Sequence, residues 1–365
     1  MSKDRKIEIS ASSVIFMILV IFTHVVAEAV SKYQTDSSIF VIAQSAHRLS
    51  AFVVQGFVFL SGLKLFLPSD KPFSYKKFYL SRITRVVIPY ILAFAIFYLY
   101  TWYAGYINPS VSHFFTEMLT GGLIGHFYFI AIICQFYLLM PLWRWMSRKD
   151  PILVLPICLL LMIVFKSAVP EIATVLGHTF ELNARMFWSY LFYFAAGVFA
   201  GRNYPRFKEL LVKTRWGMFA LFVFVGAIDC VNIVVIRRGE YYPSWAENFH
   251  ILYCIAAIFV VISFSLCVEG TRGAKIVELT DRASYNIYLI HPLFIYITDS
   301  IMGRMGLGSI SLRFLIRAVA VYLISVGGCL LFEIAKGKLK KRGLFRRASK
   351  IADSDLLCND GRTSE

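Results

Sequence analysis

Long apolar stretches, separated by short segments that hold most of the charged residues, constrain this chain more than any other feature. A helix that crosses the hydrocarbon of a bilayer needs about 20 largely apolar residues. With 58% hydrophobic and 16% charged residues and a mean hydropathy of +0.66, the 365-residue chain is unlike an ordinary soluble domain. We therefore expect an all-α, polytopic membrane protein with about ten transmembrane helices, near 12–31, 48–67, 86–106, 124–143, 151–169, 187–201, 216–236, 249–268, 284–302 and 313–334.

The basic residues predict the orientation of these helices. Most of the 38 Lys and Arg residues fall in the amino terminus, in every second loop and in the carboxyl-terminal tail. Because cytoplasmic loops carry an excess of Lys and Arg, both termini are predicted to be cytoplasmic. The same rule explains the formal net charge of +16 without a nucleic-acid partner.

The domain organisation is expected to be simple. A membrane domain at 1–335 would be followed by a basic, then polar, cytoplasmic tail at 336–365. We recognise no internal repeat and no Gly-x-x-x-Gly array that would favour close helix packing. The seven cysteines are scattered through apolar stretches, so we interpret them as small buried hydrophobic residues and predict no metal site.

Three histidines are candidate functional residues, because polar groups at membrane depth are costly. His24 lies near the middle of the first span, where a neutral imidazole can accept a proton from a hydroxyl. His291 precedes Pro292, which removes a backbone donor and leaves carbonyls near His291 available. His126 begins the fourth span on its outer side. Each of the three could instead be a packing or interfacial histidine.

Arg82 and Arg85 stand three residues apart at the start of the third span. On an α-helix they would share a face and could bind phosphates together. The positive-inside rule alone is the simpler alternative.

Other charged residues are expected to need partners inside the bilayer. Asp229 interrupts the apolar seventh span and should have a counter-charge or access to water. Arg313 and Arg317 are four residues apart on the last span, where they could extend to the interface or meet an anionic acceptor.

Several of these pieces occur together in a pattern that resembles integral-membrane acyltransferase family 3, from about residue 8 to 335. That family typically transfers an acyl group from cytoplasmic acyl-CoA to a hydroxyl of a cell-surface polysaccharide or glycolipid at the plasma membrane. The motifs that carry the resemblance are the first span with His24, Phe59-Leu60-Ser61-Gly62-Leu63, the Phe78–Pro89 segment with Arg82 and Arg85, Gly125-His126-Phe127-Tyr128-Phe129 with Tyr137 and Pro141, and Tyr288-Leu289-Ile290-His291-Pro292.

The resemblance implies roles for individual residues. His24 would be the catalytic base, Arg82 and Arg85 would bind the acyl-CoA co-substrate, and no cofactor would be bound. His126, His291 and Ser61 would lie in the cavity or on its acceptor side. The chain departs from the family pattern at Ser13, eleven positions before His24, and at Ser81, since both places often hold a basic residue.

Two other classes of function stay open at this level. The branch of the family near the poly-N-acetylglucosamine export and O-succinylation proteins has a similar length, so a polysaccharide exporter without acyl-transfer chemistry is an alternative. A small-molecule permease or sensory module is another, in which Asp229 would be the coupling acid.

Overall fold

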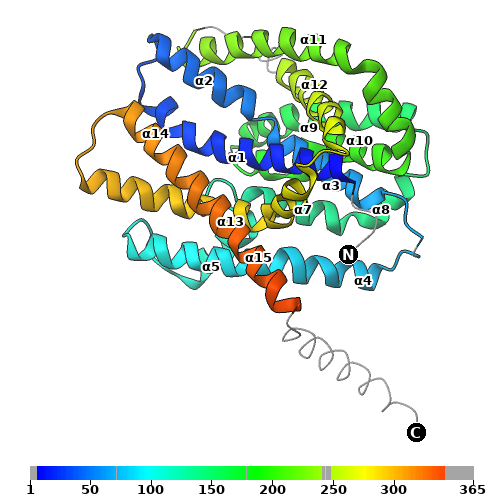
Figure 1. Ribbon diagram of the computed structural model, residues 1–365. Coiled ribbons are helices and arrows are strands. Elements are labelled where there is room, and N and C mark those ends of the chain that lie inside the picture. The colour runs from blue at the N-terminus through cyan, green and yellow to red at the C-terminus, as the bar shows by residue number, and fades with distance from the viewer. Residues whose placement is uncertain (1–5, 71, 178, 241–242, 244–247, 342–365) are drawn as a thin grey trace.

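The computed structural model describes residues 6–341, apart from 71, 178, 241–242 and 244–247, as a bundle of helices (Figure 1). No strand occurs within those residues, which confirms the all-α class. The α-helices are α1 (Ile7–Lys32), α2 (Ser38–Ser50), α3 (Val53–Phe66), α4 (Tyr75–Arg82), α5 (Ile88–Tyr103), α6 (Val111–Thr120), α7 (Tyr128–Leu138), α8 (Met140–Met146), α9 (Pro151–Val175), α10 (Leu191–Arg202), α11 (Tyr204–Arg237), α12 (Asn248–Ser265), α13 (Ala274–Arg304), α14 (Ile310–Val321) and α15 (Gly328–Lys341). π-helical turns occur at η1 (Ile83–Val87) and η6 (Tyr322–Gly327), and 3-10 turns at η2 (Asn183–Arg185), η3 (Phe187–Tyr190) and η5 (Leu266–Val268).

The helices confirm a multi-pass membrane protein, but fewer of them than predicted are long and apolar enough to cross a bilayer. In the described part of the chain there are seven, or eight if the bent pair α7–α8, with its 62° angle, is one span. The predicted spans at 187–201 and 284–302 coincide with α10 and α13, and these two helices are not among the seven. The seven are Ile7–Lys32, Ser38–Phe66, Tyr75–Tyr103, Pro151–Val175, Tyr204–Arg237, Asn248–Val268 and Ile310–Leu339.

Packing inside the bundle explains why α10 and α13 differ from the others. α10 has only 12 residues and is buried along most of its length. α13 has 31 residues but carries Asp281, His291 and Asp299 on a helix that packs against α1 and α14. A helix enclosed by other helices does not need a wholly apolar surface, since its polar groups meet protein and not lipid.

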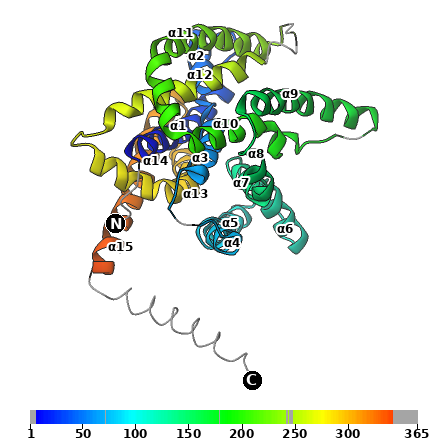
Figure 2. The same cartoon turned by 90° about the vertical axis from the view of Figure 1, so that its right-hand side faces the viewer.

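α1 lies at the centre of the bundle (Figure 2) and contacts α2, α3, α12, α13 and α14. Its buried residues include Glu8, Ser10, Ser12 and Ser13 as well as apolar side chains. α9, by contrast, lies at the edge, and most of its apolar side chains are exposed. Such an apolar outer surface is expected where helices face lipid.

α3 and α10 approach each other through three glycines, a contact that the sequence analysis missed. Gly197 and Gly201 form a single Gly-x-x-x-Gly motif on α10, and Gly62 faces them from α3. A Cβ atom on Gly197 would lie 2.1 Å from the backbone oxygen of Phe59, so no side chain fits there. Small residues of this kind allow the backbones of membrane helices to pack closely. The prediction of no Gly-x-x-x-Gly array that would favour close packing is therefore wrong, because this single motif brings α3 and α10 together.

The predicted domain boundary at 335 does not coincide with the end of a helix. α15 continues to Lys341, six residues into the predicted tail 336–365. The remainder of that tail lies outside the described residues.

We predict that Gly197→Ala lowers the free energy of unfolding by about 2 kcal/mol, because the new methyl group forces α3 and α10 apart. Thermal unfolding of the detergent-purified chain would measure the change. Gly217→Ala on α11 is the matched control, since a Cβ atom there meets nothing within 4 Å. Equal stability of both variants would contradict this account of the packing.

Candidate functional site

His24, His126 and His291, which are far apart in the sequence, come together in the middle of the bundle. They come from α1, the segment before α7, and α13. The ring centroid of His291 lies 5.3 Å from those of both His24 and His126, and His24 and His126 are 6.2 Å apart. The structure thus gathers into one cluster the three histidines that the sequence analysis singled out separately.

A cavity of about 260 Å³, named here the histidine cavity, opens beside this cluster. His24 and His126 line it, and so does His47 of α2. The sequence analysis missed His47 because it placed residue 47 in an outer loop, whereas α2 and α3 together form one longer span from Ser38 to Phe66. The other lining residues are Val20, Thr23, Ala51, Val53, Val54, Phe57, Gly125, Tyr128, Phe129 and Tyr288.

Pro292 determines the orientation of His291. A proline has no N–H, so the carbonyl oxygen of Tyr288, four residues earlier, lacks its usual helical donor. His291 Nδ1 lies 2.8 Å from this oxygen and 3.2 Å from the carbonyl oxygen of Ile287. A protonated Nδ1 donates to these carbonyls, which leaves Nε2 of the neutral ring as an acceptor. Because the carbonyl oxygen of Tyr288 has His291 Nδ1 as its partner, α13 continues through Pro292 and the ring of His291 is held in one orientation.

Three ring nitrogens of the cluster have no hydrogen-bond partner within the described protein. They are Nδ1 and Nε2 of His126 and Nε2 of His291, and both side chains are buried. The backbone oxygen of His126 accepts a hydrogen bond from the Tyr288 hydroxyl, which fixes the segment before α7 to α13. Buried polar atoms are paired in most proteins, so three unpaired nitrogens in one cluster call for an explanation, such as bound water or a catalytic role.

A second cavity of about 170 Å³, named here the inner cavity, adjoins the histidine cavity. Phe57, Phe129 and Tyr288 line both, so these rings form the wall between them. Ser61 lines the inner cavity and donates to the carbonyl oxygen of Phe57 at 2.8 Å. Ser61 is therefore a cavity residue, but it does not line the cavity that contains His24. The other lining residues are Ser13, Leu60, Lys64, Val86, Ile130, Ile133, Tyr137, Ser284 and Tyr285.

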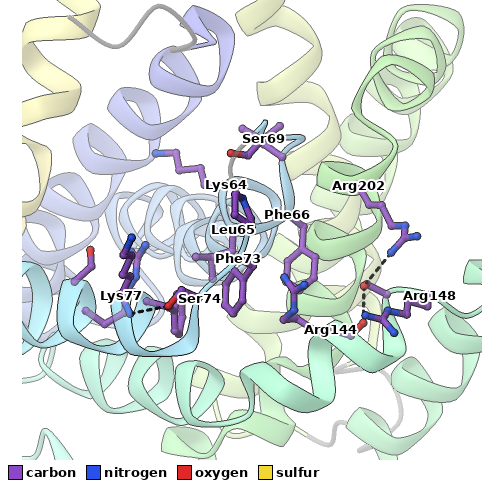
Figure 3. Close-up of a pocket in the computed structure, with 16 residues that line it drawn as sticks. Lys64, Leu65, Phe66, Ser69, Phe73, Ser74, Lys77, Arg144, Arg148 and Arg202 are labelled. Carbon is purple, nitrogen blue, oxygen red and sulfur yellow. Dashed lines mark hydrogen bonds between the residues drawn. The ribbon is translucent and has the colours of Figure 1, made fainter. Parts of the chain in front are cut away.

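The largest of these three hollows, about 570 Å³, is a basic pocket at one end of the bundle (Figure 3). Its lining includes Leu65, Phe66, Phe73, Phe78 and several serines, but no acidic residue. Sequence analysis interpreted most of its cations only as markers of orientation, because nothing in the sequence shows that three separate loops meet. The cations are Lys64, Lys77, Arg82, Arg144, Arg148 and Arg202.

Neighbouring side chains hold the arginines of the basic pocket in place. The guanidinium of Arg144 lies over the ring of Phe73, 4.0 Å from its centroid. Arg202 donates to the hydroxyl of Ser147 at 3.3 Å, a contact drawn in Figure 3. Clustered guanidinium groups of this kind suit planar, bidentate recognition of phosphate.

Arg82 and Arg85 are not equivalent in the structure. Arg82 lines the basic pocket, and its guanidinium lies 5.2 Å and 5.3 Å from the ring centroids of Phe78 and Tyr137. Arg85 is exposed and does not line the pocket. It belongs to the π-helical turn η1, whose extra residue per turn means that positions three apart no longer share a face. The shared face predicted for an α-helix is therefore wrong here.

Asp229 is fully buried and has two partners, as its position in an apolar span required. Its carboxylate accepts from Nε and Nη2 of Arg48, both at 2.8 Å, and lies 2.7 Å from Nδ1 of His250. None of these three residues lines the histidine cavity, the inner cavity or the basic pocket. This cluster ties α2, α11 and α12 together.

Arg313 and Arg317 also have partners within the protein. Arg313 Nη2 lies 3.1 Å from Glu28 Oε1, and Arg317 contacts Glu28 and donates from Nε to Asp299 at 2.8 Å. Arg317 is 1% exposed. These contacts join α14 to α1 and α13, so the side chain of Arg317 is not available to an acceptor.

The described residues hold no group of three His, Cys, Asp or Glu side chains arranged to bind a metal ion. Six cysteines are free; Cys158, Cys254 and Cys329 are buried, whereas Cys267 is exposed. Cys358 lies outside the described residues.

The fold and the site define a multi-pass, all-α membrane protein with a buried histidine cluster beside a cavity and a separate basic pocket. Comparison with known proteins agrees with this class. A family model described as an acyltransferase domain matches residues 14–334, so the chain belongs to this acyltransferase family.

Curated relatives of two kinds resemble the chain. The Bacillus subtilis (strain 168) protein named "Putative membrane-bound acyltransferase YfiQ" is 30% identical over 193 residues, which is 51% of this chain and 51% of that protein. The match thus spans about half the length of that relative. The Staphylococcus aureus (strain MSSA476) protein named "Probable poly-beta-1,6-N-acetyl-D-glucosamine export protein" is 24% identical over 302 residues, covering 80% of this chain and 83% of that protein. No solved structure matches the chain.

We predict that Asp229→Asn lowers the free energy of unfolding by about 3 kcal/mol, because the guanidinium of Arg48 loses its buried counter-charge. Thermal unfolding in detergent would measure this. The activity of the protein that stays folded should be close to native, since Asp229 lies outside the three hollows.

Glu278→Gln is the control for Asp229→Asn. Glu278 pairs with Arg282 at 3.4 Å on the exposed side of α13, and such pairs contribute about 0.5 kcal/mol or less. An Asp229→Asn protein with native stability but no activity would instead give Asp229 a functional role.

Proposed function

We propose that this protein is a membrane-bound O-acyltransferase. In this proposal it moves an acetyl or another short acyl group from cytoplasmic acyl-CoA to a hydroxyl of an extracytoplasmic cell-surface glycan. The chain would cross the plasma membrane about ten times, with both termini and the basic pocket on the cytoplasmic side. The observation that supports the proposal is the row of three adjoining hollows, in which the basic pocket shares Lys64 with the inner cavity, and the inner cavity shares the rings of Phe57, Phe129 and Tyr288 with the histidine cavity.

The basic pocket supports an anionic donor. Its cations come from α3, α4, α8, α10 and the segment after α8, and none of the described residues that line it is acidic. One of these cations, Lys64, is paired with Asp281 of α13, which lies outside the lining. The phosphates of CoA would be held there by charge-assisted hydrogen bonds, most strongly by the arginines. The pantetheine arm is long, thin and uncharged, which suits the smaller inner cavity with its serine, tyrosine and apolar lining. The arm would bring the thioester to His24.

In this proposal His24 is the general base. It would accept the proton of the acceptor hydroxyl while that oxygen attacks the thioester carbonyl. The tetrahedral intermediate then loses the thiolate as the carbon–sulfur bond breaks, and the imidazolium of His24 returns its proton to the sulfur. The products are the ester and free CoA, so no other reactant is needed. Holding both substrates beside His24 makes the reaction effectively unimolecular.

The other two histidines support the same centre. The unpaired ring nitrogens of His126 can hydrogen-bond to the acceptor sugar or to the developing oxyanion. The ring of His291, fixed by the carbonyl of Tyr288, lies 5.3 Å from that of His24 between centroids, and its unpaired Nε2 would accept a hydrogen bond from a substrate group in the same centre. His47 faces the same cavity from α2 and would meet the acceptor.

We predict that His24→Ala lowers acyl transfer by at least about a hundredfold, the usual contribution of a general base. The measurement is radiolabel transfer from acetyl-CoA to cell-surface glycan in membranes that contain the native or the variant chain. His113→Gln is the matched control, because His113 of α6 lies outside the three hollows. Native transfer by a His24→Ala protein present at the native level would refute the proposal.

We also predict that Arg82→Gln raises the KM for acyl-CoA about tenfold, since a hydrogen bond to a charged group contributes about 1.5 kcal/mol or more. Arg85→Gln should have a clearly smaller effect, because Arg85 does not line the basic pocket. Steady-state kinetics of the two variants would compare them. Equal increases in KM would mean that the donor lies along η1 and not in the pocket.

Polysaccharide export without chemistry is a second candidate, favoured by the name and the long match of the Staphylococcus aureus relative. The cavities argue against it. The histidine and inner cavities measure about 260 and 170 Å³, and the rings of Phe57, Phe129 and Tyr288 stand between them. These are spaces for a small group and not for a sugar polymer. Deletion of the gene would decide, because an exporter predicts loss of surface polymer and an acyltransferase predicts polymer without acyl groups.

A further inference from the structure

Lys64 of α3 lies where the basic pocket meets the inner cavity. Of the residues that line these two hollows, Lys64 is the one that they share. Its side chain is 44% exposed, so it lies at an opening and not in a closed core. A ligand that extends from one hollow into the other along this shared lining meets the ammonium group of Lys64.

Two other helices hold the Lys64 ammonium in that position. Its Nζ donates to the hydroxyl of Ser13 on α1 at 2.7 Å and lies 3.7 Å from Asp281 Oδ1 on α13. The other carboxylate oxygen of Asp281 accepts from Ser10 at 2.9 Å. Ser13 is 2% exposed and the side chain of Asp281 is 7% exposed. These two partners of Lys64 are therefore buried, unlike the partners in an ion pair on the protein surface. Lys64 is thus a fixed point charge at the junction of the two hollows.

The chemistry of the two hollows defines what such a charge would recognise. The other cations of the basic pocket do not line the inner cavity and can hold phosphates along a nucleotide, and the nearest of them to the inner cavity by its contacts is Arg82, whose guanidinium lies 5.3 Å from the ring centroid of Tyr137. Beyond Lys64 the lining changes to serine, tyrosine and apolar side chains, with no further cation. A ligand that matches this change of lining has a negatively charged part in the basic pocket, with its last charge beside Lys64, and continues into the inner cavity as an uncharged arm. A phosphate ester of pantetheine has this pattern.

We propose that Lys64 is a donor-positioning residue that binds the phosphate to which the pantetheine arm is attached. The inference rests on the proposed function. It adds which part of the donor is bound at the junction and therefore how far the thioester reaches toward His24. Lys64 does not touch the reacting atoms, and it acts by fixing the point at which the arm enters the inner cavity.

The test compares three acetyl thioesters with the full-length protein in lipid nanodiscs: acetyl-CoA, acetyl-4′-phosphopantetheine and acetyl-pantetheine. Lys64→Met keeps the length of the side chain and removes its charge. We expect the KM to rise about tenfold for the first two donors, which carry the phosphate. The KM for acetyl-pantetheine should not change. Lys64→Arg keeps the charge and should restore most of the affinity.

A purely structural role for Lys64 predicts a different result. If Lys64 only ties α1, α3 and α13 together, Lys64→Met would lower kcat with all three donors and lower thermal stability. Either that pattern, or an effect confined to acetyl-CoA, would overturn the assignment to this phosphate. Lys208→Met is the matched control, because Lys208 also pairs with an acid of α1, Glu8 at 3.4 Å, but lines neither hollow. It should leave all three KM values at native levels.

Equilibrium binding of CoA to the native protein separates this inference from the proposed function. A native protein that does not bind CoA overturns both. A native protein that binds CoA, with Lys64→Met binding equally well, overturns only the role of Lys64.

Discussion

The structure depends on one constraint, which is that polar side chains within a bilayer must find their partners inside the protein. α1 meets this constraint towards both of its ends. Glu8 accepts from Tyr204 of α11, Ser13 accepts from Lys64 of α3, and Glu28 pairs with both arginines of α14. Because each partner lies on a different helix, the polar groups of α1 position its neighbours around it. The cluster of His24, His126 and His291 forms inside that frame.

Charge and apolar surface are separated along the interior. Cations gather in the basic pocket, Lys64 stands at its inner end, and aromatic rings separate the inner cavity from the histidines. In the proposed function, the charged part of the donor would therefore stay away from the histidine cluster, while its uncharged arm would approach it. This separation would let one bundle bind a strongly charged donor at an aqueous face and carry out chemistry at membrane depth, where water is scarce and hydrogen bonds are stronger.

The sequence analysis succeeded where a residue is unusual for its local surroundings. His24, Asp229 and His291 were recognisable because each interrupts an apolar stretch, and all three belong to clusters that join helices distant in the sequence. It failed where the surroundings are ordinary. Arg144, Arg148 and Arg202 resemble any cytoplasmic-loop arginines, and His47 resembles any loop histidine, so only their positions in space distinguish them.

By itself, the sequence determined that this protein lies in a lipid bilayer and that its fold is all-α. The hydrophobic stretches are long enough to require a bilayer, and helices are the way in which such stretches satisfy their own backbone groups. The tertiary structure decided which helices are enclosed, which cations meet in one pocket and which arginine of the pair at 82 and 85 faces it. Those outcomes depend on close contacts such as Gly197 against Phe59 and on the π-helical turn η1, and neither is encoded in the spacing of residue types along the chain.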